Sequence, residues 1–558
     1  MKNYAVIIKE RLKNTPKSFW IFLAIMLVGV FLRTYNFHAW LDFENDQSRD
    51  AILASDVLTG KTAWPLLGPT MRGSQDAMDS LFHLGPIYYY FQIISGKIFG
   101  NYPDKLAYPD LLFSILTIPL FYIFMKRIFS VNLSLALTGL FSVSFFAVEY
   151  SRFAWNPNSL PFFSLLFLLA LYEFLLHREK TAWGWVAALG VASGVGLQLH
   201  IITALLFGTV SFLVSVYLLK KNWRVWKKII LVFAVVFVLN FPQLYSELHT
   251  GFSNSKIFAY SITHNGASGN DQSNLAQKIG LDLNCHMENN AYILSSFGSN
   301  SCLFSYGIAA RKIFHYKYQQ VKKTWSEISQ PDVAISLIVG FIFSLAGYFF
   351  LAYRAWKEQD ERKKIFLRLI SLYIAVSFLL MLPLAEKFIE ARYFIQVFFV
   401  PFLLLGFLAD FLMRKFSQKA IPAIVILFAA LAYFNLSSLA SAAKDLRIET
   451  KSDVHFAILG EMELMVKYMI NDADSQKEIY LVGDKPYRAH FFQPFFYLAR
   501  KSGVNVISVG ESSQPIAAGN VLFYLTDESR GKETTLGGYA VESRKVFGQV
   551  AIYKLRGI

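Results

Sequence analysis

Residues 19–32 read FWIFLAIMLVGVFL, an apolar run that contains no ionisable side chain. Further long apolar runs follow at 111–125, 160–176 and 231–239. A helix needs about 20 consecutive, mostly apolar residues to cross the hydrocarbon core of a bilayer. These runs therefore predict a polytopic α-helical membrane protein and argue against a soluble globular domain.

The composition supports the same class of protein. Of the 558 residues, 54% are apolar and only 17% are charged, which is too apolar for an ordinary soluble protein. The formal net charge is +15, but Lys and Arg concentrate in short loops between the apolar runs, where they mark the cytoplasmic side of a membrane. The charge therefore gives no reason to expect nucleic-acid binding. No small-residue cleavage site follows the first run, which predicts an uncleaved anchor.

The basic loops fix the predicted path of the chain through the membrane. With the N-terminus on the cytoplasmic side, about 11 transmembrane helices result. An apolar segment at 87–99 is too short to span, and we predict that it forms an amphipathic helix on the outer interface. The spans are predicted at 18–34, 107–125, 132–148, 159–176, 182–199, 201–219, 229–246, 333–353, 365–384, 393–413 and 420–438.

This path predicts two domains. Residues 1–440 are predicted to form a transmembrane catalytic domain with outer loops at 35–106 and 247–332. Residues 441–558 are predicted to form a small extracytoplasmic α/β domain, because short strand patterns alternate there with a helical pattern at 488–501. The strand patterns lie at 479–483, 504–510, 521–525 and 550–554.

The two cysteines of the chain, Cys285 and Cys302, both lie in the predicted outer loop 247–332. In an oxidising compartment they could pair and close a loop, which stabilises a protein by about 3 kcal/mol. Two free thiols are the alternative.

Polar residues that are costly in a membrane protein gather on the predicted outer face. A carboxylate there can take a proton from an attacking hydroxyl. Arginine can hold a phosphate leaving group through forked, charge-assisted hydrogen bonds. Sugar transfer from a lipid phosphate needs both, since its transition state resembles an oxocarbenium ion while negative charge grows on the phosphate. The gathered residues are Asp46, Asp50, Asp79, Arg152, Asn156, His200, Lys387, Glu390 and Arg392.

Four motifs occur in a fixed order along the chain. They are Glu44-Asn45-Asp46-Gln47-Ser48-Arg49-Asp50-Ala51, His83-Leu84-Gly85-Pro86-Ile87-Tyr88, Tyr150-Ser151-Arg152-Phe153-Ala154-Trp155-Asn156-Pro157 and Ala391-Arg392-Tyr393-Phe394. This order resembles the GT-C glycosyltransferases of the protein O-mannosyltransferase and aminoarabinose (lipid A) transferase type. The resemblance covers roughly the first 220 residues and the Arg392-Tyr393 turn.

The resemblance implies a multi-span enzyme that uses a polyprenyl-phosphate sugar and inverts the anomeric carbon by direct displacement. The catalytic aspartate of these enzymes corresponds to Asp46, but Gln47 replaces the glutamate that usually follows it. An expected second acid is replaced around Asn156. We therefore predict Asp46 as the base, with no metal and no cofactor. The predicted substrate-binding residues are Glu44, Asp50, His83, Arg152, Asn156, His200, Lys387, Arg392 and Tyr393.

The predicted partners are a polyprenyl-phosphate sugar donor, membrane lipids and a hydroxyl acceptor on a protein, lipid or glycan. Two other functions remain open. A flippase or transporter of lipid-linked sugar would place ionisable residues near the bilayer midplane, whereas here they lie at span ends. An arginine-rich long outer loop would favour a polysaccharide polymerase or ligase, whereas the loop 247–332 is rich in Asn and Ser.

Overall fold

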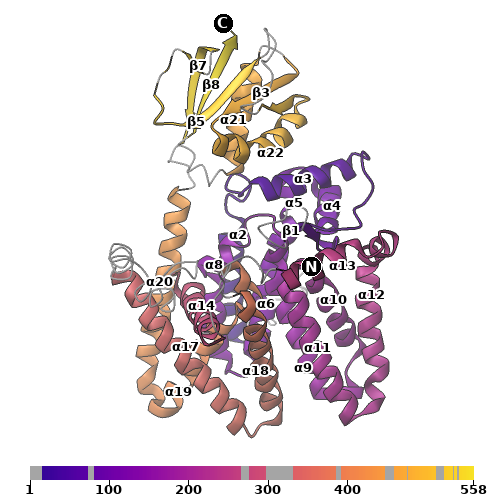
Figure 1. Ribbon diagram of the computed structural model, residues 1–558. Coiled ribbons are helices and arrows are strands. Elements are labelled where there is room, and N and C mark those ends of the chain that lie inside the picture. Colours follow the sequence, from indigo (N-terminus) through magenta and orange to yellow (C-terminus); the bar gives the residue numbers. More distant parts are fainter. Residues whose placement is uncertain are drawn as a thin grey trace, which may run out of the picture.

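The structure is a computed structural model of the whole chain. It describes residues 15–72, 81–264, 275–296, 331–384, 391–445, 458–473, 476–509, 521–531, 533, 535–536, 539–548 and 550–557. Figure 1 shows a large bundle of helices with a smaller domain at its upper end, where the yellow strands of the C-terminal residues lie. The two parts meet at helix α3, which caps the bundle beneath helix α22.

Eight helical segments of the described residues are long and apolar enough to cross a membrane, so the chain is a multi-pass membrane protein. The predicted fold class is confirmed, and a helix lies within each predicted span, although the span predicted at 393–413 begins as a 3₁₀ turn and is α-helical only from Val400. The long helices are α2 (Lys17–Thr34), α6 (Tyr108–Met125), α9 (Leu160–His177), α11 (Ile201–Lys221), α12 (Trp226–His249), α17 (Pro331–Lys357), α18 (Glu361–Met381), α19 (Val400–Phe416) and α20 (Ile421–Asp445). Two shorter apolar helices are α7 (Val131–Ser142) and α10 (Trp183–Leu199).

Short 3₁₀ turns join several of these helices. They are η1 (Asn156–Ser159), η2 (Arg178–Lys180), η3 (Trp223–Val225), η5 (Leu382–Leu384), η6 (Ala391–Val397) and η7 (Ser417–Ala420).

One predicted span is interrupted. The span expected at 132–148 ends as α7 at Ser142, and a separate short helix, α8 (Phe145–Glu149), follows. Partners from distant helices satisfy the polar groups at the break: the Ser144 hydroxyl donates to the Ile293 carbonyl at 3.0 Å. The Phe145 N–H donates to the side chain of Asn435 at 2.8 Å. Such partners permit a break where a bilayer offers no water.

Small residues allow close packing inside the bundle. Helices α10 and α12 meet at Gly190 and Gly194, where an added Cβ would lie 2.7 Å from Val235 and 2.9 Å from Leu239. Small residues at helix contacts let membrane helices approach through van der Waals packing. The parallel rings of Phe167 and Phe207, 4.1 Å apart, pack α9 against α11 in the same core.

The first inter-helix segment forms a compact layer above the bundle. It contains α3 (Asn45–Leu58), the hairpin of β1 (Thr70–Arg72) and β2 (Leu81–His83), α4 (Ile87–Phe99) and α5 (Pro103–Leu106). Helix α4 has the bounds predicted for the interfacial helix, and it packs between α3, α6 and α10. Its residues Tyr88 and Tyr89 are buried. The Gln198 side chain accepts the first free N–H of α4, from Ile87, at 3.1 Å.

The long loop predicted at 247–332 contains two described helices, α13 (Ser253–His264) and α14 (Leu275–Ser295). Helix α14 packs against α17 and α19 with a buried polar face that includes Asp282, His286 and Asn290. The Asn290 amide donates to the hydroxyls of Ser344 and Tyr348, both at 3.1 Å. A polar sequence therefore forms a buried helix because neighbouring helices supply hydrogen-bond partners.

Cys285, on α14, is buried and disulfide-bonded. The chain has one other cysteine, Cys302, which lies outside the described residues.

The C-terminal domain carries a six-stranded mixed sheet in the order β4-β3-β5-β8-β7-β6. Strands β3, β4 and β5 are parallel, whereas β5, β8, β7 and β6 pair antiparallel. Helices α21 (Leu459–Asn471) and α22 (Lys485–Lys501) belong to this domain, and α20 extends to Asp445, five residues past the predicted boundary at 440. The strands are β3 (Glu478–Gly483), β4 (Asn505–Ser508), β5 (Leu522–Asp527), β6 (Thr535–Leu536), β7 (Tyr539–Phe547) and β8 (Val550–Gly557).

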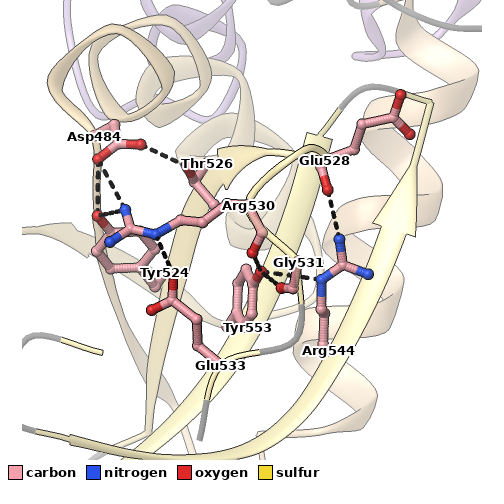
Figure 2. Close-up of polar contacts among 9 residues, drawn as sticks. All are labelled: Asp484, Tyr524, Thr526, Glu528, Arg530, Gly531, Glu533, Arg544 and Tyr553. Atoms are coloured by element: carbon pink, nitrogen blue, oxygen red, sulfur yellow. Dashed lines mark hydrogen bonds and ion pairs between the residues drawn. The ribbon is translucent and has the colours of Figure 1, made fainter. Parts of the chain in front are cut away.

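A polar network holds the loop after β5 against the sheet (Figure 2). The Tyr524 hydroxyl donates to Asp484 at 2.8 Å, and the Arg530 guanidinium donates to that hydroxyl at 2.9 Å. A second contact brings Arg530 to within 3.5 Å of Asp484. The Tyr553 hydroxyl donates to the Arg530 carbonyl at 2.7 Å, so the turn is attached to both β5 and β8.

Candidate functional site

Helix α3 presents the acidic motif, and a reciprocal cap fixes where the helix begins. The Glu44 side chain accepts the backbone N–H of Gln47, while the Gln47 side chain accepts the backbone N–H of Glu44 at 3.1 Å. This capping box satisfies two N–H groups that the helix leaves without partners. Glu44, predicted to bind substrate, is therefore engaged as the helix cap, and its substrate role stays a prediction.

Asp46 lies in the first turn of α3 with 59% of its side chain exposed. Its carboxylate contacts Arg49 Nη1 at 2.8 Å. Arg49 also binds Asp50, through Nε at 2.9 Å and Nη2 at 2.8 Å. One guanidinium thus bridges an exposed carboxylate to a buried one. The accessible carboxylate at this rim is Asp46, the residue predicted to be the base.

Asp50 points into the protein and is only 2% exposed. The Tyr89 hydroxyl donates to its carboxylate at 3.1 Å. Burial raises the pKa of Asp50 to about 6, although the neighbouring Arg49 opposes the rise. Asp50 is thus placed to hold Arg49 and Tyr89, and direct contact with a substrate stays a prediction.

A buried carboxylate that sequence analysis did not select extends this polar interior. Asp110 accepts the Tyr88 hydroxyl at 3.0 Å and the Ser159 hydroxyl at 2.8 Å. The backbone N–H of Trp155 also binds it. Tyr89 binds Asp50 of α3, and the adjacent Tyr88 binds Asp110. The two tyrosines of α4 therefore connect α3 to η1, the turn that carries Asn156. The sequence did contain a signal for Asp110: a carboxylate at the start of an apolar run requires polar partners.

Two further carboxylates next to the motifs were not selected as site residues. Asp42 forms isolated backbone bridges with Phe153 and Ile458, and Glu149 accepts a hydrogen bond from Tyr292. Burial raises the pKa of Glu149 to about 7. Burial, with repulsion from Glu44 and Glu149, holds the pKa of Asp42 well above its usual range. Asp42 and Glu149 are each adjacent to a quoted motif, so sequence position alone could have indicated them.

Arg152 closes the C-terminal end of α2. Its Nη1 donates to the Leu32 and Arg33 carbonyls, both at 3.1 Å, and its Nη2 donates to the Tyr35 carbonyl at 2.9 Å. Cations favour the carbonyl end of a helix. Burial lowers the pKa of Arg152 to about 10. A guanidinium has five N–H donors, so a phosphate contact would use the ones that these three bonds leave, and this role stays a prediction.

Asn156, His200 and Tyr393 lie around the turn between α10 and α11. The Asn156 amide donates to the Leu199 carbonyl, and His200 Nδ1 accepts the Ile202 N–H at 3.3 Å. The rings of His200 and Tyr393 meet edge to face with centroids 5.7 Å apart. The structure therefore brings together three residues that are distant in sequence. Their shared position agrees with a common subsite but does not test one.

The other predicted site residues lie outside the group formed by Asn156, His200 and Tyr393, or outside the described residues. His83 ends β2, where its Nδ1 lies 3.0 Å from the Gly68 carbonyl and its backbone pairs with the Asn254 side chain. Arg392 lies in η6, one residue before Tyr393. Lys387, Glu390 and Asp79 lie outside the described residues. Among the part of the chain that is described, no group of three or more His, Cys, Asp or Glu side chains is arranged to hold a metal ion.

Comparison with known proteins agrees with this architecture. Residues 83–245 match the family described as dolichyl-phosphate-mannose-protein mannosyltransferase. This segment contains His83, Arg152, Asn156 and His200 but neither Asp46 nor Arg392. No curated protein sequence matches the chain.

The chain is similar to solved structures, and one of them shares the fold over nearly the whole chain. The crystal structure of ArnT from Cupriavidus metallidurans in the apo state matches with a TM-score of 0.50 and 13% identity, covering 96% of this chain and 97% of that one. The apo oligosaccharyltransferase of Archaeoglobus fulgidus matches with a TM-score of 0.48 and 14% identity, covering 88% of this chain and 64% of that one. The likeness to ArnT shows that the chain has the same fold as that membrane protein.

Proposed function

We propose that this protein is an inverting glycosyltransferase that moves a sugar from a polyprenyl-phosphate donor to a hydroxyl acceptor on the extracytoplasmic face of the membrane. The observation that carries the proposal is the exposed Asp46 carboxylate at the start of α3, beside the Arg49 guanidinium. The family matched at 83–245 is named for transfer of mannose from a dolichyl phosphate, which supports a lipid-phosphate donor.

In the proposed reaction, Asp46 takes the proton from the acceptor hydroxyl as its oxygen attacks the anomeric carbon. A new glycosidic C–O bond forms while the bond from that carbon to the phosphate oxygen breaks. The electron pair leaves with the phosphate, which departs as the polyprenyl phosphate. One base is sufficient for such a single displacement, and it inverts the configuration of the anomeric carbon.

Arg49 also orients the proposed base. It holds Asp46 at 2.8 Å and is itself anchored by buried Asp50. The pair orients the base, because each contact uses a fixed edge of a planar guanidinium. The growing negative charge on the leaving phosphate requires cationic donors, and Arg152 and Arg392 are the candidates that the motifs supply.

The test is donor consumption by the purified full-length protein with a panel of labelled polyprenyl-phosphate sugars. General-base catalysis contributes about 10²- to 10⁴-fold, so we expect Asp46→Asn to lower kcat by that range while KM for the donor stays near the wild-type value. The matched control is Glu361→Gln, a carboxylate with 73% exposure at the start of α18. It should leave kcat unchanged.

Two outcomes would contradict the proposal. Unchanged transfer in Asp46→Asn would remove this residue from the reaction. Consumption of no donor, combined with movement of lipid-linked sugar across vesicle membranes, would identify a transporter.

A further inference from the structure

Helix α22 of the C-terminal domain lies alongside α3, the helix that carries Asp46 (Figure 1). The two helices contact each other near both ends of α3. The N-terminal contact involves residues 489 and 490 of α22, and the C-terminal contact joins Arg500 to Asp56, while Tyr497 and Lys501 bind the neighbouring Asn101. Both helices therefore run in the same direction along their shared face.

The N-terminal contact depends on a proline inside α22. Pro494 has no N–H, so the carbonyl of His490, four residues earlier, loses its intrahelical partner. In the orientation that satisfies its hydrogen bonds, the Asn45 amide donates to this carbonyl at 3.1 Å and to the Ala489 carbonyl at 3.3 Å. Asn45 immediately precedes Asp46. The residue immediately before the proposed base is therefore held by a carbonyl that a proline makes available.

The C-terminal contact combines an ion pair with hydrogen bonds. Arg500 binds Asp56 of α3, and both side chains are about one-quarter exposed. Tyr497 donates to the Asn101 side chain at 3.2 Å, and the Asn101 amide donates to Ser55 of α3 at 2.9 Å. Residues 497, 500 and 501 share one face of α22, since side chains three and four positions apart are neighbours.

Two attachments constrain a helix more than one attachment does. Eleven residues separate Asn45 from Asp56, which corresponds to about 16 Å along a helix. A single contact would leave the angle between α3 and α22 unconstrained by α22 itself, whereas two contacts at this separation fix the position and the direction of α3 relative to α22. Backbone pairing reinforces them just before α3, where the Leu459 N–H donates to the Leu41 carbonyl at 2.8 Å.

We propose that α22 is the positioning element for the catalytic helix: Asn45, Pro494 and Arg500 are positioning residues that hold α3 so that Asp46 meets the substrate in a fixed orientation. This inference rests on the proposed function for its catalytic consequence. It assigns the C-terminal domain a role in the reaction without any contact between that domain and the reacting atoms.

The test compares backbone hydrogen exchange of α3 with steady-state kinetics in the full-length protein. Asn45→Asp removes the amide donor and places a carboxylate against two carbonyls. Pro494→Ala restores the N–H that competes with Asn45 for the His490 carbonyl. We expect faster exchange of the α3 amides in both variants, unchanged exchange in β3 and β5, and a loss of kcat of about tenfold to a hundredfold with KM for the donor unchanged.

The matched control is Pro486→Ala, because a proline in the first turn of α22 removes no intrahelical bond. The second arm is a charge swap: Arg500→Asp should raise α3 exchange and lower kcat, and the double variant with Asp56→Arg should recover both. Wild-type exchange of α3 in Asn45→Asp and Pro494→Ala would overturn the proposal, as would failure of the charge swap to recover either readout. If no donor is consumed at all, the exchange results still decide the positioning role, so the two failures are distinguishable.

Discussion

Two polar networks of similar composition occupy opposite environments in this molecule. The network below α3 joins Asp50, Tyr89 and Arg49, and the network after β5 joins Asp484, Tyr524 and Arg530. Asp50 is 2% exposed, whereas the Asp484 side chain is 42% exposed. Each carboxylate accepts a tyrosine hydroxyl and contacts an arginine. Burial therefore distinguishes the network that holds a carboxylate inside the protein from the network that attaches a loop near the surface.

The pKa values follow this difference. Burial raises the pKa of Asp50 to about 6 despite its arginine. In the C-terminal domain, hydrogen bonds from Ser529 and Tyr487 lower the pKa of Asp527, and they outweigh the opposing effect of burial. The number of partners is similar, so the cost of desolvating the charge decides the direction of the shift.

The largest expected effect is the removal of Asp110, a buried carboxylate next to the first network. Asp110→Ala would leave the Tyr88 and Ser159 hydroxyls and the Trp155 N–H without their acceptor. Each buried group left unsatisfied costs about 1–3 kcal/mol, so we expect a loss of about 4 kcal/mol in the free energy of unfolding. Thermal unfolding in detergent measures this loss. Asp110→Asn retains an acceptor oxygen and should lose less than half as much; equal losses would show that the hydrogen bonds contribute little.

The next effect is a pH dependence set by Asp50. Its folded pKa of about 6 exceeds the ordinary value of 3.8, so its protonation favours the folded state. The stability that it contributes is complete below about pH 4 and is lost as the pH rises through about 6, up to about 3 kcal/mol. Unfolding temperature measured from pH 4 to pH 8 should therefore fall less steeply in Asp50→Asn than in the wild type. An identical slope in both proteins would contradict the assignment.

Asp527, a carboxylate at the end of β5 outside the Asp484 network, supplies the opposite sign for the same measurement. Because the folded pKa of Asp527 is lowered, its stabilising contribution is present above the ordinary pKa and is lost as the pH falls through the folded value. Asp527→Asn should therefore reduce stability at neutral pH and have little effect below about pH 3. The same direction of change for Asp50→Asn and Asp527→Asn would break the comparison between the two networks.

The sequence predicted the membrane helices well because long apolar runs depend on local composition. The bounds of α4 were predicted for the same reason, since glycine and proline limit its first turn and the apolar run limits its length. Helix α14 was missed because its residues are polar, and only partners such as Ser344 on a distant helix make its burial possible. Sequence alone does not indicate such a partner.

The candidate site divides in the same way. Asp46 could be selected from a motif, whereas the roles of Asp110, Asp42 and Glu149 depend on burial and on neighbouring groups that the structure brings to them. No sequence pattern indicates the role of the His490 carbonyl, because that role requires Pro494 on the same helix and Asn45 on another helix. Local patterns predict elements, and contacts between elements select the residues that control the site.

The smallest expected effect concerns the exposed network directly. Asp484→Ala removes an acceptor of Tyr524 and Thr526, but water can replace the carboxylate at a site where it is 42% exposed. Exposed ion pairs contribute about 0–1 kcal/mol, so we expect a loss of at most about 1 kcal/mol in the free energy of unfolding, and no change in donor consumption. A loss comparable to that of Asp110→Ala would show that the loop after β5 is as strongly coupled to the fold as the interior of the membrane domain. Burial would then not be the property that separates the two networks.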